Sequence, residues 1–377
     1  MKYIDEFRDG HLAQGLAARI RQEVNPERGY ALMEFCGGHT HAICRYGIED
    51  LLPGNVRLIH GPGCPVCVLP SGRLQAVIEL AERERLILCS YGDLLRVPGA
   101  QGDTLLQAKA RGVDVRMVYS ISDALDIARA YPDQPVVFFA IGFETTTPPT
   151  AVAILQAKAE GLNNFSAYCN HVLTPPALRA ILATESAAPI QLDGCIGPAH
   201  VSTIIGSDPY QFVAAEYQRP LVIAGFEPLD VLQAILLLIR QINAGEARVE
   251  NEYTRAVSIE GNRKAQSKVA QVFTVRPRFE WRGLGELPNS ALAIRPEYAE
   301  WDTEQRFTVN TIAIADHKAC ACAEVLRGVK RPEQCKAFAT ACTPDHPLGS
   351  CMVSAEGACA AHFHYGRFRS PQSGVSA

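Results

Sequence analysis

The sequence predicts an α/β protein with two doubly wound parallel sheets and a third, mainly helical or irregular region at the C-terminus. Short apolar runs alternate with helical patterns from about residue 30 to residue 243. The runs are continuously apolar, which is typical of strands buried on both faces of a parallel sheet. Six of the 13 cysteines fall between residues 320 and 359, where this alternation has ended.

The first group of strands is expected at 30–35, 56–60, 86–89 and 113–118. Helical patterns at 40–52, 71–83 and 104–110 separate them. Repeated strand–helix units predict right-handed crossovers between parallel strands. A further helix at 122–131 and a proline-containing break at 132–135 indicate that a second α/β unit begins here.

The second group of strands is expected at 136–142, 165–170, 192–196 and 221–225, with helices at 150–161, 175–184, 208–217 and 228–242. From about residue 245 to residue 307 the chain is polar and lacks clear periodicity, so irregular structure is expected there. We therefore expect an α/β domain at 28–131, a second at 132–243, and a third domain at 244–377 with residues 1–27 packed on it.

Composition and charge exclude several classes of protein. The net charge of −4 argues against a nucleic-acid partner, because phosphate binding needs a basic face. The most apolar stretch, 231–239, is far shorter than the roughly 20 residues of a membrane span. The charged N-terminus does not resemble a signal peptide, so a cytoplasmic protein is expected. In that compartment, clustered cysteines are usually metal ligands or redox groups.

Unusual residues follow six of the expected strands. The segments are 35–41 (FCGGHTH), 61–67 (GPGCPVC), 142–146 (GFETT), 170–171 (NH), 197–200 (GPAH) and 225–228 (GFEP). Ligands of open α/β sheets bind at the carboxyl ends of the strands. The six segments therefore predict one composite cleft between the two halves of the molecule.

Cys36 precedes two glycines and an expected helix start at Thr40. Free amides at a helix start favour a thiolate and lower the pKa of the thiol. This pattern indicates a metal-binding or nucleophilic thiolate, with a small buried core cysteine as the alternative. His39, in the same segment, is a candidate ligand or proton carrier.

Cys64 and Cys67 have the two-residue spacing that permits either a disulfide or joint metal binding. In a cytoplasmic chain this spacing favours a reversible dithiol. Half of a zinc site is the alternative, although no second matching pair stands nearby. No glycine-rich dinucleotide loop is present, so a nicotinamide enzyme is not expected.

Other candidates have plainer interpretations. Glu144 and Glu227 each follow a Gly-Phe pair and are interpreted as helix caps, with proton transfer in the cleft as the alternative. Residues 145–147, three threonines, are interpreted either as an anion-binding segment or as the start of a helix. The cysteines of apolar strands and helices are expected to pack in the core, namely Cys89, Cys169, Cys195 and Cys44.

The C-terminal cysteines admit three interpretations. Zinc sites usually draw four thiolates from close pairs, whereas Cys322, Cys335, Cys342 and Cys359 are separated by 12, 6 and 16 residues. That irregular spacing favours an iron–sulfur cluster held from several turns. Zinc, or no metal, remains the alternative.

The sequence resembles the HypD family of maturation factors for nickel–iron hydrogenases. The resemblance runs through nearly the whole chain and rests on five motifs in order: CGGHTH from Cys36, GPGCPVC from Gly61, GFETT from Gly142, GFEPLD from Gly225 and MVSAEGAC from Met352 to Cys359.

The resemblance implies a role in assembling the iron centre with cyanide and carbon monoxide ligands, Fe(CN)2CO. It implies a small HypC-type partner that shares the iron and a HypE-type partner that delivers cyanide. It implies that Cys36 is an iron ligand with His39 nearby, and that Cys64 and Cys67 are a redox dithiol. The implied 4Fe–4S ligands are Cys322, Cys335, Cys342 and Cys359, with Cys320 and Cys351 as extra cysteines.

The leading hypothesis is a redox-active assembly scaffold rather than a conventional turnover enzyme. Its cluster would pass electrons through Cys64 and Cys67 to the site at Cys36. One alternative is a binding platform whose cluster is purely structural. The other is a general dithiol oxidoreductase that acts on other proteins.

Overall fold

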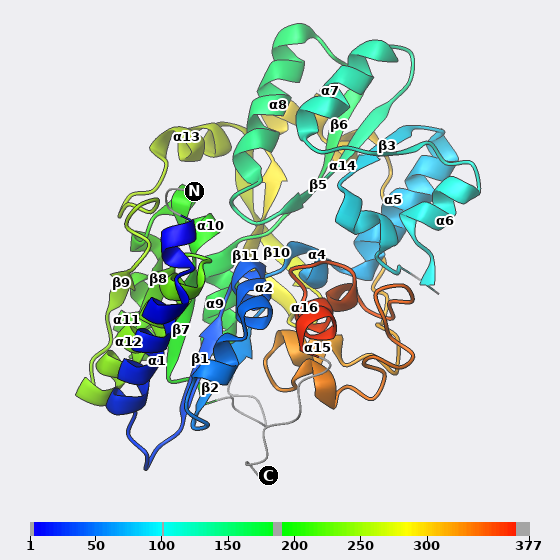
Figure 1. Ribbon diagram of the computed structural model, residues 1–377. Helices are drawn as coiled ribbons and strands as arrows, with labels where there is room; N and C mark the ends of the chain where they lie inside the picture. The colour runs from blue at the N-terminus through cyan, green and yellow to red at the C-terminus, as the bar shows by residue number, and fades with distance from the viewer. Residues whose placement is uncertain (1–3, 100–101, 184–190, 367–377) are drawn as a thin grey trace.

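A computed structural model describes residues 4–99, 102–183 and 191–366. It confirms the expected fold class, with two parallel sheets and a cysteine-rich C-terminal region of short helices (Figure 1). The last residue of the helix expected at 175–184 and residues 367–377 of the expected third domain lie outside this description. Among the described residues, no helix has the length and hydrophobicity needed to cross a membrane.

The larger sheet, called sheet A, has five parallel strands in the order β2-β1-β7-β8-β9. They span Tyr30–Glu34 (β1), Val56–His60 (β2), Gly194–Pro198 (β7), Leu221–Ala224 (β8) and Val249–Asn251 (β9). Helices on both faces make it doubly wound. One face packs against α1 (Gly10–Glu23), α2 (Gly37–Tyr46), α3 (Ile48–Leu51) and α12 (Pro228–Ala244), the other against α9 (Thr174–Leu182) and α11 (Gln211–Tyr217).

The smaller sheet, called sheet B, has four parallel strands in the order β4-β3-β5-β6. They span Ile87–Ser90 (β3), Val115–Met117 (β4), Val136–Gly142 (β5) and Phe165–His171 (β6). One face packs against α4 (Pro65–Val68), α5 (Ser71–Glu84) and α6 (Leu105–Ala110), the other against α7 (Ile121–Ala130) and α8 (Thr147–Glu160). Both sheets turn the carboxyl ends of their strands toward the middle of the molecule.

Most expected elements lie within a few residues of their predicted bounds. The helix expected at 40–52 is two helices, because Gly47 adopts φ +64° between α2 and α3. The helix expected at 208–217 begins as the 3-10 turn η4 (Asp208–Tyr210) before α11. Short elements complete this part of the chain: η1 (Asp5–Phe7), η2 (Gly92–Arg96) and α10 (Ala199–Ile205).

The strand order differs from the expected division of the chain near residue 131. Strands β1 and β2 lie in one sheet with β7, β8 and β9, whereas β3 to β6 form a sheet of their own. The chain therefore leaves sheet A after β2, builds sheet B, and returns. Parallel pairing joins strands that are distant in sequence, and the apolar runs themselves do not show which strands are partners.

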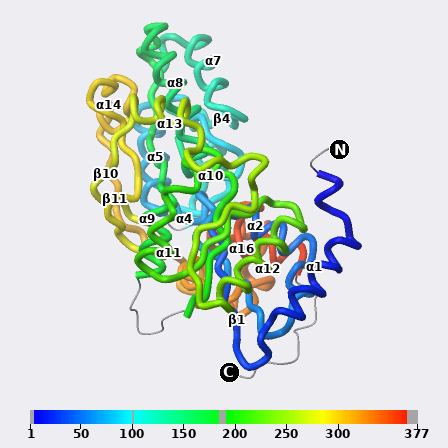
Figure 2. Tube along the Cα trace, turned by 90° about the vertical axis from the view of Figure 1, so that its left-hand side faces the viewer, coloured from blue at the N-terminus to red at the C-terminus, as the bar shows by residue number. Residues whose placement is uncertain are grey.

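The prediction of irregular structure at 245–307 is wrong. The segment forms β9, α13 (Arg263–Val272), the hairpin of β10 (Phe273–Trp281) and β11 (Gly285–Ile294), η5 (Pro296–Trp301) and α14 (Thr303–Arg306). Phe273, Phe279 and Trp281 of β10 are buried, whereas most of the residues between them are exposed. The segment is therefore not an apolar run, and the sequence does not mark it as a strand. In both views the hairpin runs beside sheet B and reaches α9 (Figures 1 and 2).

The cysteine-rich end packs against α2 and α4, at the junction of the two sheets (Figure 1). Its ordered elements are short: α15 (Cys322–Leu326), η6 (Pro332–Gln334), η7 (Ser350–Met352) and α16 (Ala358–Tyr365). They agree with the expected mainly helical or irregular character. This position brings the C-terminal cysteines next to the loops that follow β1 and β2.

Candidate functional site

The strand-end segments meet around one cavity of about 310 Å3. Of the six segments singled out in the sequence, four contribute to its lining, through Cys36, Gly63, Thr146 and His200. The segments at 170–171 and 225–228 do not. The cleft is therefore composite, as expected, and its walls come from both sheets.

Cys36 lies between β1 and α2 and is buried. Its backbone N–H donates to Glu34 Oε2 at 2.9 Å. The two following glycines permit close packing within the chain. A Cβ on Gly37 would lie 2.4 Å from Glu356 Cβ, and one on Gly38 would lie 2.6 Å from Phe226 Cε1. Gly37 thus lets the loop of Cys36 pack against the C-terminal segment, and Gly38 lets it pack against Phe226.

The environment of Cys36 raises the pKa of its thiol instead of lowering it, so the expected effect of the helix start is wrong for the metal-free chain. Burial contributes most, followed by the negative charge of Glu356, and Glu34 adds to it. Backbone N–H groups of the first turn of α2 oppose this rise only in part. A cation beside Cys36 would reverse the balance, because a positive charge stabilises the thiolate.

Cys64 and Cys67 form a disulfide at the start of α4, with their Cα atoms 5.2 Å apart. Their loop adjoins that of Cys36. The N–H of Gly37 donates to Gly63 O at 3.1 Å, and a Cβ on Gly63 would lie 2.4 Å from Cys36 N. The structure therefore brings Cys36, Cys64 and Cys67 onto two touching loops.

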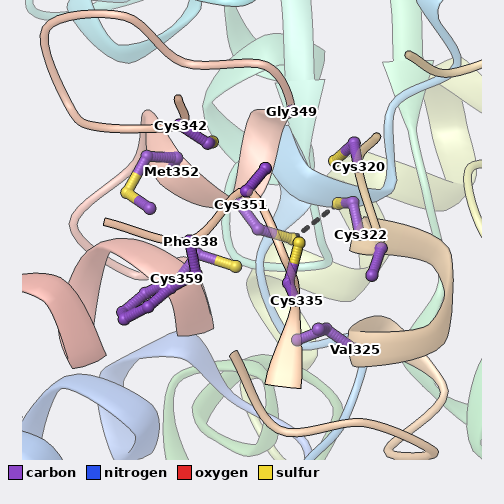
Figure 3. A pocket seen from close by; sticks show the side chains of 12 residues that line it. Cys320, Cys322, Val325, Cys335, Phe338, Cys342, Gly349, Cys351, Met352 and Cys359 are labelled. Carbon is purple, nitrogen blue, oxygen red and sulfur yellow. Dashed lines mark hydrogen bonds between the residues drawn. The ribbon is translucent and has the colours of Figure 1, made fainter. Parts of the chain in front are cut away.

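All six C-terminal cysteines line a single pocket (Figure 3). The set contains the four expected ligands Cys322, Cys335, Cys342 and Cys359, and also the two expected to be extra, Cys320 and Cys351. The Sγ atoms of Cys322 and Cys351 lie 2.8 Å apart. The remaining lining is apolar, from side chains such as Val325, Phe338 and Met352 (Figure 3). Converging thiols in an apolar pocket fit a soft metal or an iron–sulfur cluster.

Ser350 connects this pocket to the disulfide. Its hydroxyl donates to Cys67 O at 3.1 Å and lies 3.9 Å from Cys322 Sγ. The two cysteines of the disulfide share one hydrophobic cluster with Cys322 and Cys351. The cysteine pocket, the disulfide and the cavity at Cys36 therefore follow one another without an intervening layer of structure.

His39 lies one turn after Cys36 but does not line the cavity. Its Nε2 is 2.9 Å from Ala224 O and 3.0 Å from Gly225 O, so this nitrogen carries the proton. Its Nδ1 is buried and has no hydrogen-bond partner among the described residues. Burial lowers the pKa of His39, which favours the neutral ring. His200 lines the cavity instead, with its ring 4.1 Å from that of Phe226.

Three lining residues had no assigned role in the sequence. His200 had a usable signal, because it follows a strand. Asp93 had none, since it lies in the short turn η2, and Glu356 had only its place in the MVSAEGAC motif, which does not show that it faces the cavity. Ser354 joins these two walls by donating its hydroxyl to Asp93 Oδ2 at 2.8 Å.

The two glutamates of the Gly-Phe pairs are helix caps. Glu227 is the N-cap of α12, as expected. Glu144 accepts hydrogen bonds from the N–H and hydroxyl of Thr174, at 2.8 and 2.9 Å, at the start of α9 and not of the helix that follows it in sequence. Burial raises the pKa of Glu144 to about 7.

The strand cysteines Cys89, Cys169 and Cys195 are fully buried, which confirms core packing. Burial raises the pKa of each thiol to about 12. Cys44 differs from them. It is buried on α2, but it lies against His60 and His362 and not against apolar side chains alone.

Comparison with known proteins finds relatives over nearly the whole chain. The family model described as "HypD: Hydrogenase formation hypA family" matches residues 11–366. The "Hydrogenase maturation factor HypD" of Rhizobium leguminosarum bv. viciae is 62% identical over 372 residues, or 98% of this chain and 97% of the relative. The protein of the same name from Escherichia coli K12 is 46% identical over 370 residues, or 97% and 98% of the two chains.

Identity of this extent, over almost the full length of each protein, shows common descent and not a shared motif alone. The chain therefore belongs to the HypD family of hydrogenase maturation factors.

Proposed function

We propose that this chain is a redox-active scaffold on which the Fe(CN)2CO centre of nickel–iron hydrogenase is assembled. The observation that supports this most is the continuous series of Cys36, the Cys64–Cys67 disulfide and the cysteine pocket. If the cysteine pocket had only a structural role, it would not need to lie against the Cys64–Cys67 disulfide, nor would that disulfide need to lie beside Cys36.

In this proposal the iron is the substrate and Cys36 is its ligand from this chain. Thiolates suit reduced iron, which also binds cyanide and carbon monoxide. The cavity holds two further carboxylates, from Asp93 and Glu356, which would favour a bound cation. A HypC-type partner would share the iron at this cavity, and a HypE-type partner would deliver cyanide there. The two histidines of the proposed site would be His39, which lies one turn after Cys36, and His200, which lines the cavity.

A 4Fe–4S cluster held by Cys322, Cys335, Cys342 and Cys359 would supply single electrons. Breaking the bond between Cys64 and Cys67 takes two electrons and two protons and leaves two thiols. Ser350 holds the backbone of the disulfide loop against the pocket that would donate these electrons. The dithiol would then stand beside Cys36 in its reduced form.

The structure disfavours a general dithiol oxidoreductase. Cys64 is 3% exposed and Cys67 is fully buried, whereas exchange with a protein disulfide requires direct access to a sulfur. A platform without electron transfer is the alternative that needs an experiment.

The test replaces Cys64 and Cys67 with serine, singly and together, in anaerobically purified protein. Infrared bands of iron-bound cyanide and carbon monoxide should disappear from the scaffold, while the electron spin signal of the reduced cluster remains. Cys195→Ser, a buried cysteine of β7, is the matched control and should keep both signals. Iron-centre assembly at the normal rate in the double variant would exclude electron transfer through the disulfide and favour the platform without electron transfer. Zinc without a 4Fe–4S signal in the wild type would exclude the electron path altogether.

A further inference from the structure

We propose that Cys44, His60 and His362 form a binding site for one zinc-type divalent metal ion, separate from Cys36 and from the cysteine pocket. The three residues come from α2, the last position of β2 and α16. One ligand atom from each lies within 4.8 Å of the other two. Their side chains are 4%, 8% and 3% exposed, so the group lies in the interior.

Hydrogen bonds to carboxylates fix which ring nitrogen of each histidine carries a proton. His60 Nδ1 lies 2.9 Å from Glu34 Oε1, and His362 Nδ1 contacts Glu333 Oε1. A carboxylate only accepts, so both Nδ1 atoms donate. Each neutral ring then presents the lone pair of Nε2 on its opposite side.

The two lone pairs point at each other. His60 Nε2 and His362 Nε2 are 2.8 Å apart in a buried place. Two neutral rings in this arrangement would repel, so a cation must lie between them. The cation is either a proton, which would turn one ring into an imidazolium, or a metal ion.

Cys44 favours the metal ion. A thiol beside two converging imidazole nitrogens completes three of the ligands that zinc takes in proteins. Carboxylates that hold the far nitrogen of each histidine are the usual outer partners of such ligands. A divalent ion bound by one thiolate and two neutral rings has one net positive charge, and the carboxylates of Glu34 and Glu333, each beside one of the rings, would attract it.

The distance between the two imidazole nitrogens requires only a small adjustment. With zinc–nitrogen bonds of about 2.0–2.1 Å and a zinc–sulfur bond of about 2.3 Å, a tetrahedral site places ligand atoms roughly 3.3–3.6 Å apart. The two Nε2 atoms would separate by about half an ångström from their 2.8 Å spacing. Three protein ligands leave the fourth position of a tetrahedral site open.

The site would join parts of the molecule that serve the proposed function. Helix α16 carries Cys359 three residues before His362, and α2 begins next to Cys36. Glu34, which holds His60, also accepts the N–H of Cys36. A bound ion would therefore fix the C-terminal helix against the loop that carries Cys36.

The test compares metal content among full-length variants purified anaerobically. Because the thiols of the cysteine pocket are also able to take up zinc, the difference between variants is measured after loading with zinc alone. Cys44→Ala should contain one zinc equivalent less than the wild type, and the buried-cysteine control Cys195→Ala should equal the wild type. With cobalt(II) in place of zinc, Cys44→Ala should lose the thiolate-to-cobalt absorption of one ligand.

A second variant guards against misfolding of the first. Glu333→Gln keeps the shape of the side chain and should weaken zinc at this site about 10- to 100-fold in competition with a coloured chelator. Equal zinc content and equal cobalt spectra in the wild type, Cys44→Ala and Cys195→Ala would overturn the proposal. So would unchanged affinity in Glu333→Gln. A shared proton would then lie between the two rings.

Discussion

Replacing Gly63 with alanine should separate the disulfide loop from the loop of Cys36. The added Cβ would lie 2.4 Å from Cys36 N, 2.6 Å from Cys36 Cα and 2.6 Å from Phe35 C. All three atoms are backbone, so one loop must move by about 1 Å to reach ordinary contact. Overpacking of this kind costs about 1–3 kcal/mol.

Gly54→Ala is the matched control, because a Cβ there meets nothing within 4 Å. Both changes remove the same freedom from the unfolded chain, so their difference isolates the clash. Urea unfolding followed by fluorescence reports on Trp281, which packs in the same hydrophobic cluster as the disulfide. Gly63→Ala should be about 1–3 kcal/mol less stable than Gly54→Ala, and it should bind iron more weakly.

Equal stability of the two variants, within about 0.5 kcal/mol, would refute the argument that these loops are in contact. Loss of stability with normal iron binding would show that the loops touch but that Cys36 does not depend on the disulfide loop for its position.

Three further predictions concern the support of the site. Ser350→Ala removes the hydrogen bond to Cys67 and should cost about 0.5–1.5 kcal/mol in urea unfolding, with slower reduction of the disulfide. Between pH 4.5 and 7 the wild type should lose stability as pH rises, because burial raises the pKa of Glu144 to about 7 and ionisation then favours the unfolded chain. Glu144→Gln should show a smaller loss across this range. Arg73→Ala leaves its buried polar partners, Asn170 of β6 and Glu304 of α14, without their ligand and should lower the free energy of unfolding by about 3–5 kcal/mol. The exposed control Arg83→Ala should lower it by about 0–1 kcal/mol.

The sequence predicts the elements of the fold better than their pairing. The apolar run 136–142 coincides with β5, because burial on both faces leaves a continuous signal. The hairpin of β10 and β11 was missed, since one face of it is polar. The pairing of β1 with β7, which is distant in the chain, cannot be recognised from the sequence of either strand.

The spatial grouping of candidate residues is predictable where they share a topological position. Cys36, Cys64 and Cys67 follow strands, and the structure brings them together. The neighbours of Cys44 could not be read from its helix, because His60 and His362 approach it only in the folded chain. The thiol of Cys36 shows a similar limit, since the carboxylate of Glu356 comes from 320 residues away along the chain.

The interleaved order of the two sheets has a consequence for synthesis on the ribosome. Sheet B is complete once β6 has emerged, whereas β1 must wait for β7, more than 160 residues after it. Until then β1 and β2 are a two-stranded fragment with an open edge, which is prone to mispairing. The cysteine-rich segment emerges last of all. In nascent chains the strands of sheet B should therefore pair before sheet A is complete, while the core of sheet B still awaits Val272, Phe273 and Leu292.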